Sequence, residues 1–338
     1  MQNLPLLFKS KAAILHILEQ KTYIYYVDAA GRLYRYDTQT AHNQLIVDGS
    51  TWLILDEEVS LYAYKNYVAV VNIRQVYGFV YDTVADETAL FMKRGDYQVE
   101  HCSFALAFLQ IEGRDCCLHG TDWNRLDIYD LKDKRYLTDR DEENHHFDYF
   151  HSLLYMSPDA QHFAVNGWHW SPYDMIYTFK IGDFLEKYEL AHQAIEHYEH
   201  SGYNWDRPFC WVDNQTVALI FGNKEAGNDE GDKLIPFAYI LPQNLNNELL
   251  ETIPILDEVL NQKLLNKEYE PKGRLFYHSA KSYFIIATLH NYWAVLDKTG
   301  KLIFADDKQQ LIDYKPEANL CLLQNIAGEF SLFSPAKW

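Results

Sequence analysis

The sequence predicts an all-β fold, a seven-bladed β-propeller whose blades are four-stranded antiparallel sheets. Three observations predict it: a short aromatic–Asp motif recurs along the chain, strand-like runs precede each copy, and aromatic residues make up 15% of the sequence. Tyr, Phe and Trp suit the pleated, half-buried surface of a sheet. A closed all-β fold also reaches 338 residues as one unit. We therefore expect a single propeller domain spanning 1–338.

The repeated motif alternates apolar and aromatic residues and ends in Asp. Its clearest copies end at Asp37, Asp82, Asp130 and Asp297, and the first three are 45 and 48 positions apart. Each copy is the third of three short strand-like runs, and a fourth run usually follows it. A period of about 40 to 50 residues with four strands per unit is typical of propellers.

The expected strands fall into seven groups, separated by Asp, Gly, Asn and Pro at the turns. In chain order they are 12–18, 23–28, 33–37 and 44–48; 59–64, 67–73, 78–82 and 88–92; 102–111, 115–119 and 126–130; 152–157, 162–167 and 175–180; 209–212, 216–222 and 235–241; 275–279, 283–289 and 292–296; and 311–314, 320–324 and 330–333.

The last group has only three strands, and the segment Leu4–Phe8 is the candidate for its fourth. Ring closure by this N-terminal strand would remove the exposed sheet edges of an open arc. We therefore expect the two ends of the chain to be neighbours.

Two segments depart from the strand pattern. The segment 183–200 carries apolar residues at helical spacing, among them Phe184, Leu185 and Tyr188, and the segment 244–270 is long and shows no strand alternation. We expect short helical insertions near 183–200 and 244–270, each beside an outer strand.

One turn carries a family resemblance. Met156-Ser157-Pro158-Asp159-Ala160 precedes the strand that begins at His162. Together with the motifs that end in Asp, this turn resembles WD40-type propeller repeats, in which a Ser-Pro-Asp-Gly turn joins the first two strands of a blade. Ala160 stands where Gly is usual, and the repeats lack the Gly-His and Trp-Asp dipeptides of the fullest WD40 repeats. The resemblance implies the architecture of a WD40-like propeller and no particular function.

The net charge of the chain limits the classes of partner that we expect it to bind. Lys and Arg number 30 and Asp and Glu number 48, which gives a formal net charge of -18. A nucleic-acid-binding protein needs a basic patch or stripe, and an anionic membrane surface would repel this chain. We expect neither nucleic acid nor membrane as a partner, and the acidity favours a basic protein or peptide.

The cysteines and the N-terminus point to a reducing compartment. The five cysteines are odd in number and irregularly spaced, and no CxxC pair occurs, so they form neither a disulfide framework nor a zinc motif. The first residues contain no signal-peptide pattern, and no apolar stretch approaches the length of a membrane span. We expect a cytoplasmic protein without a cofactor.

The candidate binding residues lie in loops. In a WD40-like blade, the loops between strands two and three lie on the same face as the connections between blades. Four of the eight tryptophans fall in these segments and are expected to converge on one face, together with a tyrosine and an arginine. The predicted binding residues are Trp123, Trp168, Trp170, Tyr173, Trp205 and Arg207. Exposed rings there would indicate a binding surface; the alternative is that the rings pack against one another.

Carboxylates and histidines on the same face are weaker candidates for catalysis. Aromatic rings beside carboxylates are typical of clefts that cleave or bind sugars. The candidate acid or base groups are Asp148, Asp174, Asp206, His146 and His169. His145, His146, Asp148 and His151 lie within seven positions, yet no metal-binding motif is present and we predict no metal site.

Three functions remain open. The first is a non-enzymatic scaffold that binds a protein or peptide through an aromatic and acidic loop face. The second is a hydrolase or lyase acting on carbohydrate or another small molecule, which requires two carboxylates in a pocket beside aromatic rings. The third is a structural subunit of a larger assembly, which predicts apolar exposure on the rims of the blades.

Overall fold

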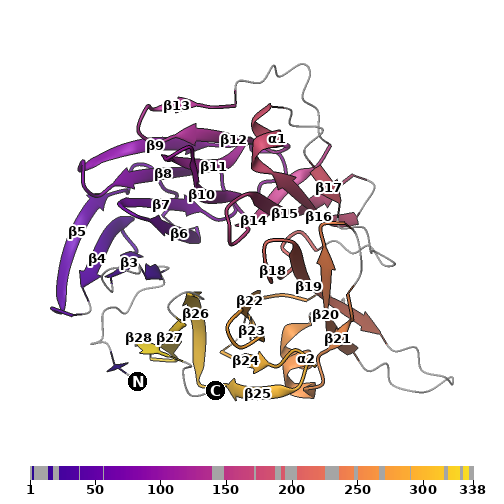
Figure 1. Ribbon diagram of the computed structural model, residues 1–338. Coiled ribbons are helices and arrows are strands. Elements are labelled where there is room, and N and C mark those ends of the chain that lie inside the picture. Colours follow the sequence, from indigo (N-terminus) through magenta and orange to yellow (C-terminus); the bar gives the residue numbers. More distant parts are fainter. Residues whose placement is uncertain are drawn as a thin grey trace.

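The structure, a computed structural model, is a ring of seven four-stranded antiparallel sheets (Figure 1). It describes residues 2–3, 14–17, 23–37, 39–55, 57–138, 148–170, 173–186, 192–194, 204–224, 236–246, 250–265, 271–289, 291–315, 319–327 and 330–334. The prediction of a seven-bladed propeller is therefore confirmed.

The first four blades follow one another along the chain, each with its strands in sequence order from the inside of the ring outwards. Blade one contains β2 (Ile14–Ile17), β3 (Tyr23–Val27), β4 (Arg32–Asp37) and β5 (His42–Asp48). Blade two contains β6 (Val59–Tyr64), β7 (Tyr67–Asn72), β8 (Tyr77–Asp82) and β9 (Glu87–Lys93). Blade three contains β10 (Leu106–Ile111), β11 (Arg114–Asp122), β12 (Arg125–Asp130) and β13 (Arg135–Tyr136). Blade four contains β14 (Phe150–Met156), β15 (His162–His169), β16 (Tyr173–Lys180) and β17 (His192–Ala194).

The remaining three blades complete the ring. Blade five contains β18 (Phe209–Trp211), β19 (Thr216–Lys224), β20 (Pro236–Asn244) and β21 (Ile253–Pro254). Blade six contains β22 (Arg274–His278), β23 (Tyr283–Ala287), β24 (Trp293–Leu296) and β25 (Leu302–Asp306). Blade seven contains β26 (Gln309–Lys315), β27 (Leu320–Asn325), β28 (Phe330–Phe333) and β1 (Gln2–Asn3).

Blade seven is closed by the other end of the chain. β1 pairs antiparallel with β28, Gln2 opposite Leu332 and Asn3 opposite Ser331, and the two ends of the chain lie close together in Figure 1. The expected closure by an N-terminal strand is confirmed, but the pairing residues precede the predicted segment. Leu4–Phe8 lies outside the described residues.

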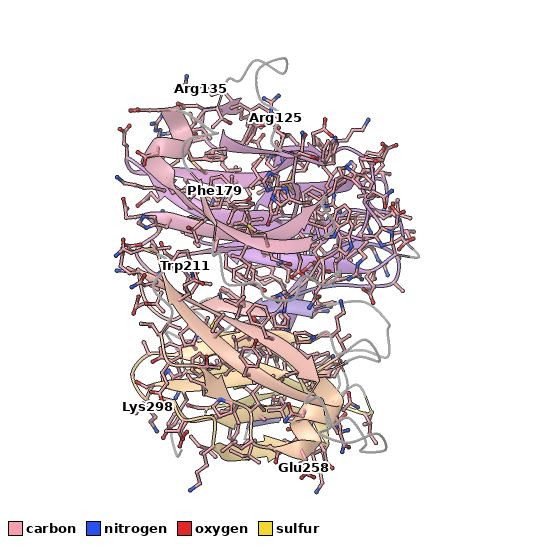
Figure 2. The ribbon with its side chains drawn as sticks, turned by 90° about the vertical axis from the view of Figure 1, so that its right-hand side faces the viewer. Arg125, Arg135, Phe179, Trp211, Glu258 and Lys298 are labelled. Atoms are coloured by element: carbon pink, nitrogen blue, oxygen red, sulfur yellow. The ribbon has the colours of Figure 1, made fainter. Side chains whose placement is uncertain are left out.

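The two short helices occur where the strand pattern breaks. α1 (Ile181–Glu186) follows the third strand of blade four, and α2 (Glu258–Leu264) follows the outer strand of blade five. Asp257 caps α2 by accepting a hydrogen bond from the backbone N–H of Leu260 at 2.7 Å. The predicted insertions therefore also contain the outer strands β17 and β21. In the side view, α2 with Glu258 lies at the opposite end of the ring from Arg125 and Arg135 of blade three (Figure 2).

Seven apolar clusters of the described core lie between blades, one between each pair of neighbouring blades. Successive side chains of a strand point to opposite faces of its sheet. Cys116 therefore packs against blade four while Cys117 packs against blade two. Because both faces of an inner strand are covered, its sequence is continuously apolar, as in the run Val68–Val71.

One face of the ring carries the candidate binding residues, and we call it the connector face. It is formed by the loops between the second and third strands of each blade and by the connections between blades, because the strand directions alternate within each blade. Trp123, Trp170 and Trp205 all lie in these segments, and Trp168 lies next to one of them near the end of β15.

Candidate functional site

The structure brings the four predicted tryptophans together on the connector face. We call the group of six rings there the aromatic cluster; it comprises Tyr97, Trp123, Phe150, Trp168, Trp170 and Trp205. Phe150 is at its centre, with ring centroids 4.5 Å from Trp123 and 5.2 Å from Trp205. The rings therefore pack against one another, which is the second of the two arrangements expected from the sequence.

Part of the aromatic cluster nevertheless remains exposed. Trp168 is buried and stacks on Trp205, with centroids 4.7 Å apart and planes 17° from parallel. Trp170 is 47% exposed and Tyr97 is 45% exposed, and their ring centroids are 6.0 Å apart. Two exposed rings thus stand on a packed aromatic base, which holds their orientation.

The backbone beneath Trp168 is closely packed. Gly167 pairs with His151 across β15 and β14, and a Cβ atom at Gly167 would collide with the carbonyl oxygen of Phe150. Glycine in a strand often marks such a close approach of another backbone. The register of β14 against β15 also shifts between His151 and Leu154. Such irregularities redirect side chains, and Ser152 lies within this one.

A pocket of about 680 Å³ opens beside the aromatic cluster. This volume is in the range of pockets that bind small molecules or single side chains of a partner. Its lining combines three indole rings with charged and polar side chains from three inter-blade connections and two loops: Arg74, Gln98, Glu100, His101, Trp168, Trp170, Trp205, Asp206 and Lys272.

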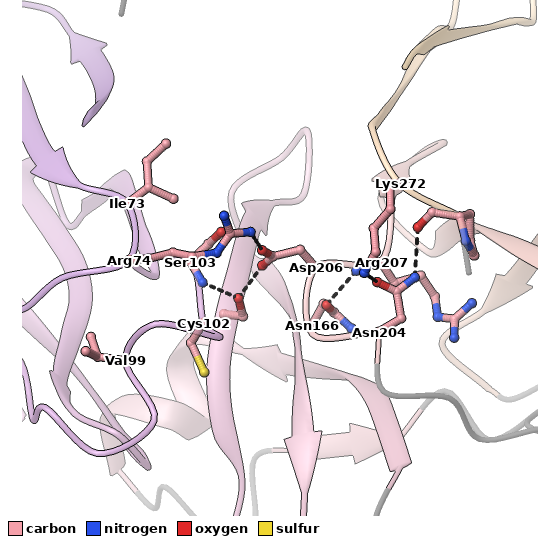
Figure 3. A network of polar contacts seen from close by, with 12 residues as sticks. Ile73, Arg74, Val99, Cys102, Ser103, Asn166, Asn204, Asp206, Arg207 and Lys272 are labelled. Carbon is pink, nitrogen blue, oxygen red and sulfur yellow. Dashed lines mark hydrogen bonds and ion pairs between the residues drawn. The ribbon is translucent and has the colours of Figure 1, made fainter. Parts of the chain in front are cut away.

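Asp206, one of the lining residues, takes part in a network of polar contacts with Arg74 (Figure 3). Its Oδ2 accepts a hydrogen bond from Arg74 Nη2 at 2.8 Å, and its Oδ1 accepts one from Ser152 Oγ at 2.5 Å. Ser152 Oγ in turn accepts the backbone N–H of Ser103 at 2.7 Å. Arg74 belongs to blade two, and Asp206 to the connection between blades four and five. Since blades two and five are not neighbours, this ion pair spans the ring opening.

Arg94 anchors the connection between blades two and three, which supplies one wall of the pocket. The buried guanidinium donates hydrogen bonds to the carbonyl oxygens of Ser103 at 2.9 Å and Cys102 at 2.8 Å. It also lies over the ring of Phe104, 4.8 Å from the centroid. Burial lowers the pKa of Arg94 to about 10, which leaves the group charged at neutral pH. These hydrogen bonds from Arg94 stabilise the connection that carries Glu100 and His101.

Two predicted site residues lie beneath the surface. Arg207 Nε donates to Asp174 Oδ2 at 2.6 Å, and both side chains are buried. Arg207 Nη1 also donates to the carbonyl of Ile220 at 3.1 Å, and its guanidinium lies 4.4 Å from the ring centroid of Phe221. Neither Arg207 nor Asp174 lines the pocket. Their position is that of a structural ion pair between blades four and five.

The other predicted residues do not form a common site. Asp148 is exposed outside the pocket lining, and the Nε2 atom of partly buried His169 lies 2.9 Å from the hydroxyl oxygen of Tyr177. His146 lies outside the described residues, as does the side chain of Tyr173. Among the residues that the structure does describe, no group of three or more His, Cys, Asp or Glu side chains is placed to hold a metal ion.

Sequence reasoning missed Arg74, Tyr97, His101, Phe150 and Lys272. Phe150 is the first residue of an inner strand, so its ring is indistinguishable in sequence from a core residue. Arg74 and Lys272 are single basic residues almost 200 positions apart. A systematic collection of every loop on the connector face would have included both, but nothing local marks them as neighbours.

Comparisons with known proteins identify the fold and no closer relationship. No protein-family model matches the chain, and no curated protein matches it. Among solved structures, a chain of the mitotic checkpoint complex is similar with a TM-score of 0.60 and 8% identity, covering 98% of this chain and 92% of that one. This chain has the fold of a WD40-like propeller.

A second similar structure is the β-propeller domain of Cps50 (Swd1) from Myceliophteria thermophila, with a TM-score of 0.59 and 8% identity. The alignment covers 97% of the WD40-like propeller described here and 98% of that domain. At this identity the likeness establishes the fold alone. Within the described residues, no helix is long and apolar enough to span a membrane.

Proposed function

We propose that this propeller is a non-enzymatic scaffold that binds a protein or peptide through its connector face. The observation that carries the proposal is the exposure of Trp170 and Tyr97 on the packed base of the aromatic cluster, next to the pocket. Rigid aromatic side chains lose little conformational entropy on binding, and Trp and Tyr are enriched among residues that dominate interface energies. One protein of similar fold is a chain of the mitotic checkpoint complex, so this architecture serves in a multiprotein assembly there.

The charge of the chain supports a basic partner, and its free cysteines support a cytoplasmic location. A net charge of -18 attracts positively charged proteins over distances of about a Debye length, near 8 Å at physiological ionic strength. Such attraction accelerates association and weakens as salt is added. The five cysteines are all buried free thiols, which is compatible with a reducing compartment.

An enzymatic function has less support from the positions of the candidate groups. Of the predicted acids, Asp174 is buried in an ion pair, and Asp206 is held by Arg74 and Ser152. Glu100 is the second carboxylate in the pocket lining, and it is exposed. Glycoside hydrolysis requires one carboxyl group that can give a proton to the leaving group and a second on the opposite side of the substrate, whereas both oxygens of Asp206 are already occupied by donors.

The rims of the blades offer a second candidate interface. Leu45 on β5, Phe91 on β9 and Ile303 on β25 are exposed apolar residues on outer strands. Phe91 is 57% exposed and contacts Trp52, with ring centroids 5.0 Å apart. The exposure of these apolar residues is the observation that favours a structural subunit. Phe91 also serves as the control position in the experiment below.

The test compares Trp170→Ala with Phe91→Ala in affinity capture from a lysate of the source cell, followed by binding measurements with the purified partner. Truncating a central aromatic contact typically costs about 2 kcal/mol or more, so we expect Trp170→Ala to weaken binding about 30-fold. Phe91→Ala should bind like the wild type. Trp168 is left intact because it is buried and its removal would disturb the fold.

The opposite pattern, with binding lost in Phe91→Ala and kept in Trp170→Ala, would assign the interaction to the rim and overturn the proposal. Equal binding by both variants would place the interface elsewhere. Thermal unfolding of each variant establishes that both remain folded.

A further inference from the structure

The pocket contains an arginine with unused hydrogen-bonding capacity. A guanidinium has five N–H donors in a planar fork. Within the part of the chain that the structure describes, Arg74 makes one side-chain hydrogen bond, from Nη2 to Asp206 Oδ2 at 2.8 Å. Its side chain is 46% exposed and lines the pocket. The remaining N–H groups of Arg74 are therefore accessible to an acceptor that enters from solvent.

A second cation is held at the same pocket. Lys272 Nζ donates to Asn204 Oδ1 at 2.8 Å, and Asn204 is itself fixed by donating to the carbonyl of Pro271 at 2.9 Å (Figure 3). Asn204 is buried, so the amide that receives the lysine has a defined position.

The carboxylates of the lining already have donors. Asp206 accepts hydrogen bonds from both Arg74 and Ser152. Glu100 is exposed, and its Oε1 lies 3.7 Å from His101 Nε2. Although the chain as a whole is strongly acidic, the Arg74 guanidinium therefore still presents N–H donors that no described residue occupies. Asp206 and Glu100 are the carboxylates among the described lining residues, and Glu100 is the more exposed of the two.

The apolar side of the pocket is built from the exposed edge of the aromatic cluster. Trp205 is already in contact with two rings: it stacks on Trp168, with centroids 4.7 Å apart, and its centroid is 5.5 Å from that of His101. Trp170 meets Trp168 edge to face, at 5.1 Å and 72°, and is half exposed. Trp170 is thus the ring on which an incoming apolar group can stack.

We propose that the pocket binds a carboxylate carried beside an apolar or aromatic side chain of a partner peptide, with Arg74 receiving the carboxylate and Trp170 the side chain. This inference rests on the proposed function and specifies its ligand. Arginine pairs with carboxylates through two parallel hydrogen bonds, and the geometry already observed toward Asp206 leaves part of the fork for a second carboxylate. The carboxylate belongs either to a chain terminus or to an Asp or Glu side chain.

The experiment uses two probes that differ only in charge, N-acetylphenylalanine and N-acetylphenylalanine amide. Binding is followed by calorimetry and by quenching of tryptophan fluorescence, to which phenylalanine does not contribute. A probe of this size is expected to bind with a Kd on the order of 1 mM. We expect the acid to bind at least about tenfold more tightly than the amide, because the amide keeps one acceptor oxygen but lacks the negative charge and the second acceptor oxygen.

The matched control is a second surface arginine. Arg32 forms an ion pair with Asp28 whose side-chain exposures, 45% and 15%, are nearly those of Arg74 and Asp206, 46% and 16%. Arg32→Gln should keep the preference for the acid, and Arg74→Gln should abolish it while leaving weak binding of the amide. Acetylated Phe-Glu amide and Phe-Gln amide repeat the comparison for a side-chain carboxylate and distinguish the two sources.

Equal binding of acid and amide to the wild type, or an acid preference that survives Arg74→Gln, overturns the carboxylate assignment. The carboxylate assignment is also overturned if no probe binds at concentrations several times the expected Kd. In either case the proposed function stands if binding of the protein partner still depends on Trp170. If the probes show no acid preference and partner binding does not depend on Trp170, the proposed function is overturned as well.

Discussion

At the scale of single residues, the pair formed by Arg207 and Asp174 is the strongest candidate for a structural role. Replacing Arg207 by Met leaves the Asp174 carboxylate buried without its cation. We expect this to lower the free energy of unfolding by about 3 to 5 kcal/mol, whereas the double variant Arg207→Met, Asp174→Leu should recover most of the loss. Urea unfolding of the two variants measures both quantities. A loss below about 1 kcal/mol in Arg207→Met would contradict a buried charge at Asp174.

His119 gives the fold a defined response to pH. The imidazole is buried, and burial lowers its pKa. Its Nδ1 lies 2.9 Å from the carbonyl oxygen of Gly120, so the neutral ring donates there, and the nearby Asp127 carboxylate partly opposes the effect of burial. In the unfolded chain the imidazole takes up a proton near pH 6.5. Because the folded protein resists this protonation, stability is full above that pH and falls below it.

The expected loss is at most about 1.4 kcal/mol for each pH unit below 6.5, and it ends where the folded imidazole also becomes protonated. Chemical unfolding of the wild type and His119→Gln between pH 7.5 and 5 measures it. The difference in unfolding free energy between the two proteins should shift in favour of the variant as the pH falls. A difference independent of pH would mean that His119 takes up its proton over the same pH range in the folded and unfolded states, which would contradict the lowered pKa.

At the scale of elements, the strand that closes blade seven is the most consequential. Among the described residues, the N-terminal segment pairs with β28 through Gln2 and Asn3 alone, on the side of β28 opposite β27. Deleting residues 1–3 leaves β28 as an edge strand with unpaired backbone groups, which favours association with other chains. We expect a lower midpoint of thermal unfolding and a tendency to dimerise or aggregate, measured by calorimetry and size-exclusion chromatography. Deletion of residues 335–338, which lie beyond β28, is the control. An unchanged midpoint would show that closure at β1 contributes little.

The elements also show what the sequence predicts well. Nearly every expected inner strand matches an observed one, because apolar runs bounded by turn residues follow directly from burial on both faces. The closing strand was placed at Leu4–Phe8 and is found at Gln2–Asn3. A two-residue edge strand has almost no hydrophobic pattern to define its register. The outer strands β17 and β21 were hidden in the segments predicted to be insertions, because each has only two or three residues.

At the scale of the whole molecule, the candidate site depends on contacts between distant parts of the chain. The convergence of Trp123, Trp170 and Trp205 followed from the alternation of strand directions, which fixes the face on which each loop emerges. Which side chains would be buried did not follow from that rule. Arg207 was expected on the surface because it occurs in a connection between blades, yet Asp174 and the ring of Phe221 enclose it. Pairings across the ring, such as that of Arg74 with Asp206, leave no local signature.

The pairing of β1 with β28 also imposes an order in time on the newly synthesised chain. Gln2 is made before its partner Leu332, and roughly 330 residues separate the two. At about 5 to 20 residues per second, this interval lasts on the order of 15 to 60 s. Throughout it the blades already made form an open arc with an unpaired edge at each end. The ring can close through this pairing only after Leu332 has been made, so the growing arc is the form most exposed to aggregation.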